Sequence, residues 1–187
     1  MLLSLIVASL IVMGSPGPST ISVTAIGAAF GLRRSLGYLS GLIAGTLAVL
    51  VAVAAGVVSL LLAAPRLAPV LLAVSAFYIL YLAYRIATAP PLSKQDKAVA
   101  APSFAGGVLL AIANPKAYVA IAAVFAGSTL GGVPKTAVLG VMIVLIHLVW
   151  WLGGASFARV FHDPVWSRHV NLAFAAALVA TTVYAVM

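Results

Sequence analysis

Six long apolar stretches, separated by short charged or proline-rich breaks, constrain the fold of this chain more than any other feature. They lie at about residues 2–31, 37–62, 67–86, 105–131, 134–158 and 169–187. A helix needs about 20 apolar residues to cross the ~30 Å hydrocarbon layer of a bilayer. Charged residues are only 6% of the 187, against about 25% in soluble domains. We therefore predict an all-α membrane protein of six transmembrane helices, with residues 1–187 forming a single transmembrane domain.

The charges that remain exclude several other classes of protein. The ten Lys and Arg residues are scattered in ones and twos, so the net charge of +8 does not indicate a nucleic-acid partner. The chain has no cysteine, and His162 and His169 do not have metal-binding spacing, so we predict no metal site and no cofactor. The first apolar stretch has no basic residue before Arg33 and no A-x-A site, so we expect it to be retained in the membrane.

A polar, proline-containing linker, about residues 89–103, divides the chain into two halves of three predicted spans each. Repeat one then covers about residues 1–88 and repeat two about residues 104–187. Basic residues concentrate in cytoplasmic loops, and seven lie in loops one, three and five against two on the other side. The seven are Arg33, Arg34, Arg85, Lys94, Lys97, Arg159 and Arg168, and the two are Arg66 and Lys135. We therefore predict that both termini are non-cytoplasmic and that the halves are inverted repeats.

Proline interrupts the first and fourth stretches at equivalent places. The run from Gly14 to Pro18 contains two prolines, and at an offset of 99 residues Ser15 and Pro16 match Asn114 and Pro115. Proline removes a helical N–H and clashes with the preceding turn, so we predict that the first and fourth helices are broken near the membrane midplane. The simpler reading is that these prolines only kink packed helices.

Broken helices also suggest a binding site, because half-helix N-termini present free N–H groups that can hold an anion. We accordingly predict a site for a carboxylate at the two breaks. Its candidate residues are Ser15, Pro16, Gly17, Pro18, Asn114, Pro115 and Lys116, with Tyr78 as a further candidate to line the cavity.

Three motifs together resemble the LysE/RhtB superfamily of amino-acid exporters over nearly the whole chain. They are Ser-Pro-Gly-Pro at 15–18, Asn-Pro-Lys at 114–116 and Phe-Tyr-Ile-Leu-Tyr-Leu at 77–82. The resemblance implies export of amino acids or related small metabolites across a bacterial plasma membrane, usually driven by an ion gradient. It implies a secondary transporter and not an enzyme.

The absence of carboxylates inside the predicted spans limits the solute. The chain has no glutamate, and Asp96 and Asp163 fall in predicted loops. A lysine near the midplane is costly without a partner, so Lys116 must contact either the carbonyls that end the preceding half-helix or a transported anion. Because no acid is available for a second cationic group, we expect a neutral or acidic amino acid. A metal or organic cation as solute, and a non-transporting scaffold, stay as alternatives.

His147 lies near mid-depth in the fifth stretch and is the only side chain there that titrates near neutral pH. Many members of the superfamily carry an aspartate around this place, so this chain departs from their pattern. We predict that His147 couples transport to protons, and the alternative is a neutral, hydrogen-bonded core residue. A membrane-embedded enzyme would need Ser15 and His147 as a nucleophile pair, and no acid is present to orient them. The oligomeric state is open, with a homodimer as one arrangement.

Overall fold

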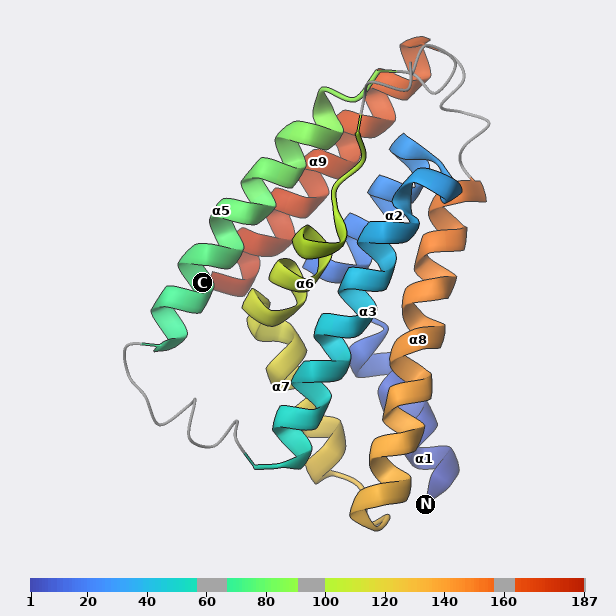
Figure 1. The fold of residues 1–187 in the computed structure, drawn as a ribbon, viewed down its shortest axis with the longest axis vertical. Helices are drawn as coiled ribbons and strands as arrows, with labels where there is room; N and C mark the ends of the chain where they lie inside the picture. Colours follow the sequence, from blue (N-terminus) through green and yellow to red (C-terminus); the bar gives the residue numbers. More distant parts are fainter. Residues whose placement is uncertain (57–66, 91–99, 157–163, 187) are drawn as a thin grey trace.

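The computed structural model describes residues 1–56, 67–90, 100–156 and 164–186, and every regular element in those ranges is helical (Figure 1). The first half holds α1 (Leu2–Ala8), the π-helix η1 (Ser9–Met13), α2 (Pro18–Phe30), α3 (Leu32–Ala54) and α5 (Leu67–Ala87). The second half holds α6 (Phe104–Ala113), α7 (Pro115–Ala126), α8 (Gly132–Ser156) and α9 (Pro164–Val186). The all-α prediction is confirmed for this part of the chain. Lys94, Asp96, Lys97, Arg66, Arg159, His162 and Asp163 lie outside the described residues.

The first and fourth apolar stretches are broken helices, as the prolines predict. Residues Leu2–Met13 and Pro18–Phe30 meet at 71°, and Phe104–Ala113 and Pro115–Ala126 meet at 62°. Each pair is apolar and long enough to count as one bent span. Neither break is a mild kink, so the simpler reading of the prolines does not hold.

Three unbroken helices are long and apolar enough to cross a membrane: Leu32–Ala54, Pro69–Ala87 and Gly132–Gly154. With the two bent pairs, the described residues supply up to five spans by length and composition. The helix α9 covers the sixth predicted stretch and has 23 residues, but it does not meet that criterion. The number six is therefore only partly supported.

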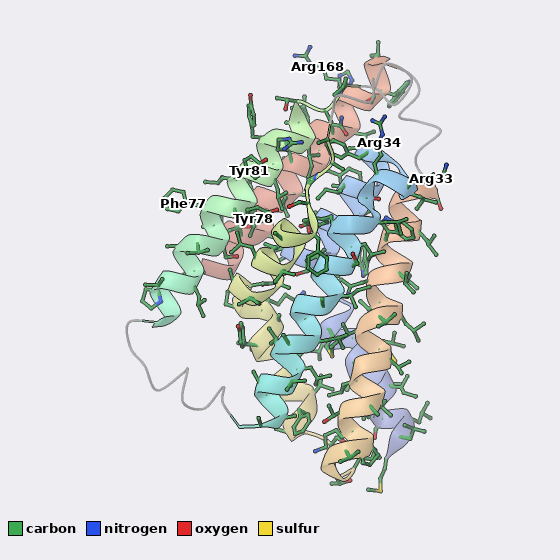
Figure 2. The ribbon with its side chains drawn as sticks, viewed as in Figure 1. Arg33, Arg34, Phe77, Tyr78, Tyr81 and Arg168 are labelled. Carbon is green, nitrogen blue, oxygen red and sulfur yellow. The ribbon has the colours of Figure 1, made fainter. Side chains whose placement is uncertain are left out.

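The boundary between the first two stretches differs from the prediction. A single residue, Gly31, separates α2 from α3 and adopts φ 76°, a left-handed conformation that glycine reaches without strain. Arg33 and Arg34 consequently lie in the first turn of α3 instead of in a loop. Figure 2 places both, together with Arg168, at the end of the molecule opposite the N-terminus, which Figure 1 marks.

The two halves pack on each other reciprocally. The bent first span packs through α2 on α8, and the bent fourth span packs through α6 and α7 on α3. The helices α3 and α8 also contact each other, while α5 and α9 lie alongside one another at one side of the bundle (Figure 1). Exchange of the two halves would convert the contact of the first span with α8 into the contact of the fourth span with α3.

Glycines allow the closest of these approaches. A Cβ at Gly41 of α3 would lie 2.0 Å from the Phe104 carbonyl oxygen, and a Cβ at Gly107 of α6 would lie 2.3 Å from the Tyr38 carbonyl oxygen. Gly37, Gly41 and Gly45, at a four-residue spacing on α3, therefore face α6. This packing fixes the first half of the broken fourth span against α3.

Candidate functional site

The first break is a short non-helical segment, residues 14–17, between two helices. The π-helix ends with the Gly14 N–H donating to the Ser9 carbonyl at 3.1 Å, and α2 begins at Pro18. Gly17 is extended, with φ −171°, and its N–H donates to Thr20 Oγ1 at 2.9 Å. The Thr20 hydroxyl in turn donates to the Gly17 carbonyl at 3.1 Å. A π-helix turn next to a break is frequent at functional sites.

The second break consists of one residue, Asn114, and it is capped. The Asn114 side-chain oxygen accepts from the Lys116 backbone N–H at 3.1 Å, as expected for an N-cap. Pro115 occupies the first helical position of α7, where a missing N–H costs nothing. The Asn114 amide donates across the molecule to Ser19 Oγ in α2 at 2.9 Å. The two breaks are therefore in direct contact.

Lys116 joins the two breaks more strongly. Its ammonium donates to the Ser15 carbonyl at 2.7 Å, the Ser15 hydroxyl at 2.9 Å and the Pro16 carbonyl at 2.8 Å. These three bonds use all three ammonium protons. The expected partners were the carbonyls of the preceding half-helix or a transported anion, but the carbonyls that accept from Lys116 belong to the other break. A Cβ at Gly17 would lie 2.8 Å from Lys116 Nζ, so the glycine makes room for this contact.

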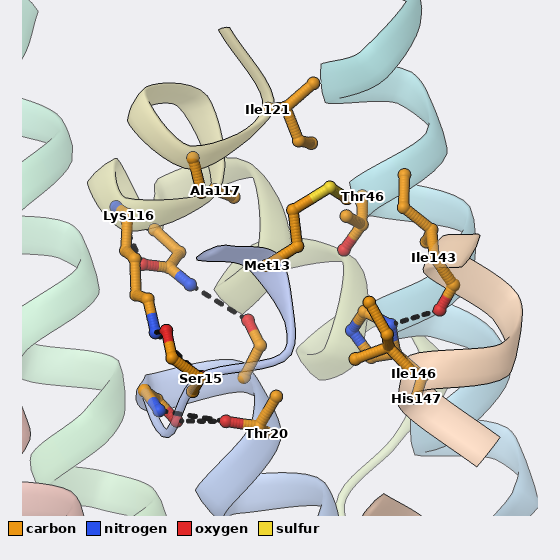
Figure 3. A pocket seen from close by; sticks show the side chains of 14 residues that line it. Met13, Ser15, Thr20, Thr46, Lys116, Ala117, Ile121, Ile143, Ile146 and His147 are labelled. Carbon is orange, nitrogen blue, oxygen red and sulfur yellow. Dashed lines mark hydrogen bonds between the residues drawn. The ribbon is translucent and has the colours of Figure 1, made fainter. Parts of the chain in front are cut away.

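A small cavity of about 50 Å³ lies where the two breaks meet (Figure 3). Its polar residues come from both halves, and its walls are apolar. The lining residues are Met13, Ser15, Gly17, Ser19, Thr20, Thr46, Asn114, Lys116, Ala117, Ala120, Ile121, Ile143, Ile146 and His147. Like small-molecule pockets, the cavity is mostly apolar with a few placed polar groups. No described lining residue is acidic.

His147 lies across this cavity from Lys116 (Figure 3). Its side chain is 5% exposed. One ring nitrogen, Nδ1, is 2.8 Å from the Ile143 carbonyl oxygen, while Nε2 is buried without a hydrogen-bond partner in the described residues. Ser15 does not pair with this histidine, because its hydroxyl donates to the Val12 carbonyl and accepts from Lys116. Ser15 and His147 therefore do not form a nucleophile and base pair.

The other residues that were predicted for the site do not line this cavity. Pro16, Pro18 and Pro115 shape the breaks without lining the cavity. Tyr78 lines a separate hollow between α5 and α6, beside Tyr81 and Arg85. Figure 2 shows Tyr78 on α5, at the side of the bundle where Phe77 and Tyr81 project outward.

Three polar residues at the site, Ser19, Thr20 and Thr46, were not predicted. Thr46 of α3 lines the cavity, and Trp150 of α8 donates its indole N–H to the Gly14 carbonyl at 3.1 Å. The Trp150 carbonyl also accepts from the Thr24 hydroxyl of α2 at 3.0 Å. Ser19 and Thr20 directly follow the first break, and that position is a signal that would have identified them.

Comparison with known proteins agrees with this geometry. Residues 10–187 match the family model described as LysE type translocator. The chain is 32% identical over 182 residues to the cysteine/O-acetylserine efflux protein of Escherichia coli (strain K12), which covers 91% of this chain and 90% of the relative. It is 31% identical over 181 residues to the protein of the same name from Salmonella typhi, with the same coverage. No solved structure matches the chain.

These matches cover most of the described helices and both breaks. The chain is a multi-pass membrane protein of a bacterial efflux family, and it is a transporter and not an enzyme. The resemblance read from its three motifs is confirmed, and the chain belongs to the LysE type translocator family of amino-acid exporters.

Proposed function

We propose that this transporter exports small neutral amino acids of the cysteine and O-acetylserine class, with acidic amino acids as the second candidate class, and that the cavity at the two breaks is its solute site. One observation carries the proposal: a cavity with polar groups from both halves lies where both half-helices α2 and α7 begin. A relative that matches this chain over 90% of its own length is named a cysteine/O-acetylserine efflux protein.

Lys116 is the group that we propose for the solute carboxylate. In the structure its ammonium binds two carbonyls and one hydroxyl, which are neutral acceptors. A carboxylate adds the attraction of opposite full charges, which a neutral carbonyl or hydroxyl lacks, so it can replace one of these acceptors. The N-termini of α2 and α7 add a positive potential at the same place. Ser15, Gly17 and Asn114 complete the proposed site, and Tyr78 stays a prediction in a different hollow.

We also propose that α9 is the sixth span and that the halves are inverted repeats, with both termini non-cytoplasmic. The reciprocal packing of each broken span on the other half supports the repeat. The arginines gathered at the end opposite the N-terminus support the orientation, because cytoplasmic ends carry the basic residues (Figure 2). Rocking of the two halves about the breaks would then open the cavity to each side in turn.

Counterflow in proteoliposomes tests the proposed function. Purified protein is reconstituted with unlabelled amino acid inside, and uptake of radiolabelled cysteine, aspartate and lysine is compared. We expect cysteine to accumulate transiently, aspartate to move less, and lysine to stay at the level of empty vesicles. Accumulation of lysine or of Cd²⁺ without cysteine or aspartate would contradict the proposal.

A further inference from the structure

The unpartnered Nε2 of His147 is the polar atom of the cavity that the proposed function leaves unexplained. A carbonyl oxygen only accepts hydrogen bonds, so the 2.8 Å contact with Ile143 places a proton on Nδ1. In the neutral imidazole the lone pair is then on Nε2. A buried acceptor without a partner costs free energy, and such atoms are uncommon in folded proteins. This one belongs to a side chain that lines the cavity.

An amino-acid solute has a group that needs such an acceptor. Its carboxylate is accounted for by Lys116, whereas its ammonium group requires acceptors, and no described lining residue is acidic. Lys116 and His147 line the cavity from opposite sides (Figure 3), so a solute bound between them meets both groups. Thr46 offers a second acceptor, because its hydroxyl proton is used on the Leu42 carbonyl at 2.7 Å.

We propose that Nε2 of His147 receives the ammonium group of the solute, and that a proton competes with the solute for the same lone pair. The inference rests on the proposed function and deepens it. Protonated His147 has no acceptor and carries a positive charge, so it rejects an ammonium group. A proton arriving from one side therefore displaces the solute, which is the exclusivity that proton-for-solute exchange requires.

Few charged or titratable groups of the described residues lie around His147. Within the described residues, α1, η1 and α2, which pack on α8, carry no titratable side chain. The helix α3 carries Arg33 and Arg34 at its far end and Tyr38, whose hydroxyl donates to Ser22 at 3.0 Å. Lys116, across the cavity, is the charged group that lines it. Lys135 on α8 itself donates to the Phe125 and Ser128 carbonyls.

The ammonium contact is tested by competition with an analogue that lacks the amine. Counterflow of labelled cysteine by the full-length protein is inhibited either with unlabelled cysteine or with 3-mercaptopropionate, which keeps the thiol and the carboxylate. We expect the wild type to need about tenfold more 3-mercaptopropionate than cysteine for half-inhibition, as a charge-assisted hydrogen bond predicts. In His147→Leu this ratio should fall below about threefold.

A matched histidine controls for side effects. His169 on α9 makes the same contact, with Nδ1 2.8 Å from the Val165 carbonyl oxygen, but it is exposed and outside the cavity. His169→Leu should keep the wild-type ratio. If His147→Leu also keeps that ratio, the ammonium contact is overturned.

The proton competition has a separate test that does not depend on the leucine variant. His147→Gln retains an amide oxygen as acceptor and does not titrate, so it should keep the preference for cysteine. For the wild type, half-inhibition by cysteine should require at least about fivefold more cysteine at pH 5.5 than at pH 7.5, and for His147→Gln it should be constant. A glutamine variant with the wild-type pH dependence overturns the competition. If the wild type transports no amino acid at all, the proposed function fails and the inference fails with it.

Discussion

The two breaks occupy equivalent places in the two halves but differ in what they offer. The first, from Gly14 to Gly17, is a run of non-helical backbone in which the Ser15 and Pro16 carbonyls accept from Lys116. The second is a single capped residue, Asn114, and it sends donors outward: its own amide and the Lys116 ammonium. In the contact through Lys116, the first break therefore supplies the acceptors and the second break supplies the donor.

This difference explains how irregular backbone is tolerated inside an apolar bundle. Unpaired carbonyls in lipid cost several kcal/mol each, so a break must find partners in protein or in a wet cavity. Here each break satisfies the other at one side of the cavity. The contact that stabilises the bundle is then also the contact that a solute carboxylate would enter.

The largest effect should come from removing the donor that joins the breaks. Lys116→Met deletes three hydrogen bonds and leaves the Ser15 and Pro16 carbonyls without the ammonium. We expect cysteine counterflow to fall at least about tenfold, and the free energy of unfolding to fall by about 1–3 kcal/mol. Counterflow and thermal unfolding in detergent measure the two effects.

Lys135→Met is the matched control, because Lys135 also donates to two carbonyls, at 2.9 and 2.8 Å, but lies away from the cavity. We expect Lys135→Met to be less stable than the wild type and to keep the wild-type KM for cysteine. Wild-type transport by Lys116→Met would return that lysine to a purely structural role.

The cap of the second break should have the next largest effect. Asn114→Ala loses the cap on the Lys116 N–H and the bond to Ser19, for which we expect a loss of about 1–2 kcal/mol. Asn114→Asp keeps the capping oxygen and should recover about half of that loss in thermal unfolding. If the aspartate variant is as unstable as the alanine variant, the cap is not the stabilising feature.

The spacing between the breaks can be disturbed from the acceptor side. Gly17→Ala places a Cβ 2.8 Å from the flexible end of Lys116, so the lysine must shift while the extended backbone is unstrained. We expect the KM for cysteine to rise about threefold, on the basis of one weakened hydrogen bond. Gly132→Ala, which meets nothing within 4 Å, should leave KM unchanged. An equal KM in both variants would show that the Gly17 contact does not matter for transport.

The smallest effect should come from the tryptophan that supports the first break. Trp150→Phe removes the indole N–H that donates to the Gly14 carbonyl, a bond worth about 1 kcal/mol. Trp151→Phe removes a similar bond to Ser35 Oγ at 2.7 Å, remote from the break. Both variants should unfold at slightly lower temperature, and only Trp150→Phe should raise KM, by less than about twofold. A larger shift from Trp151→Phe would contradict this assignment.

Prolines and apolar length were enough to predict the helical class and the two broken helices, because both signals are local. They predicted the place of each break within a few residues, since a missing N–H acts on its own turn. The single-residue turn at Gly31 was missed, because apolar patterns do not resolve a junction where one glycine replaces a loop.

The partner of Lys116 was not predictable in the same way. Local reasoning offered the carbonyls of its own half, whereas the acceptors lie about a hundred residues earlier in the chain, on Ser15 and Pro16. Thr46 was missed for the same reason, because its role depends on which helices meet. His147 was selected from its depth and its titration near neutral pH, and its unpartnered Nε2 appears only in the packed structure.

The central claim is that the cavity between the breaks holds the solute, and the absence of cysteine from this chain makes a direct test available. Ala117→Cys introduces one thiol on the cavity wall, and Thr129→Cys introduces one at an exposed position in the turn between α7 and α8. Reaction with a water-soluble maleimide is followed in membranes with and without saturating O-acetylserine. We expect O-acetylserine to slow labelling of Ala117→Cys at least about fivefold and to leave Thr129→Cys unchanged. Equal labelling rates of Ala117→Cys with and without the amino acid would contradict the claim.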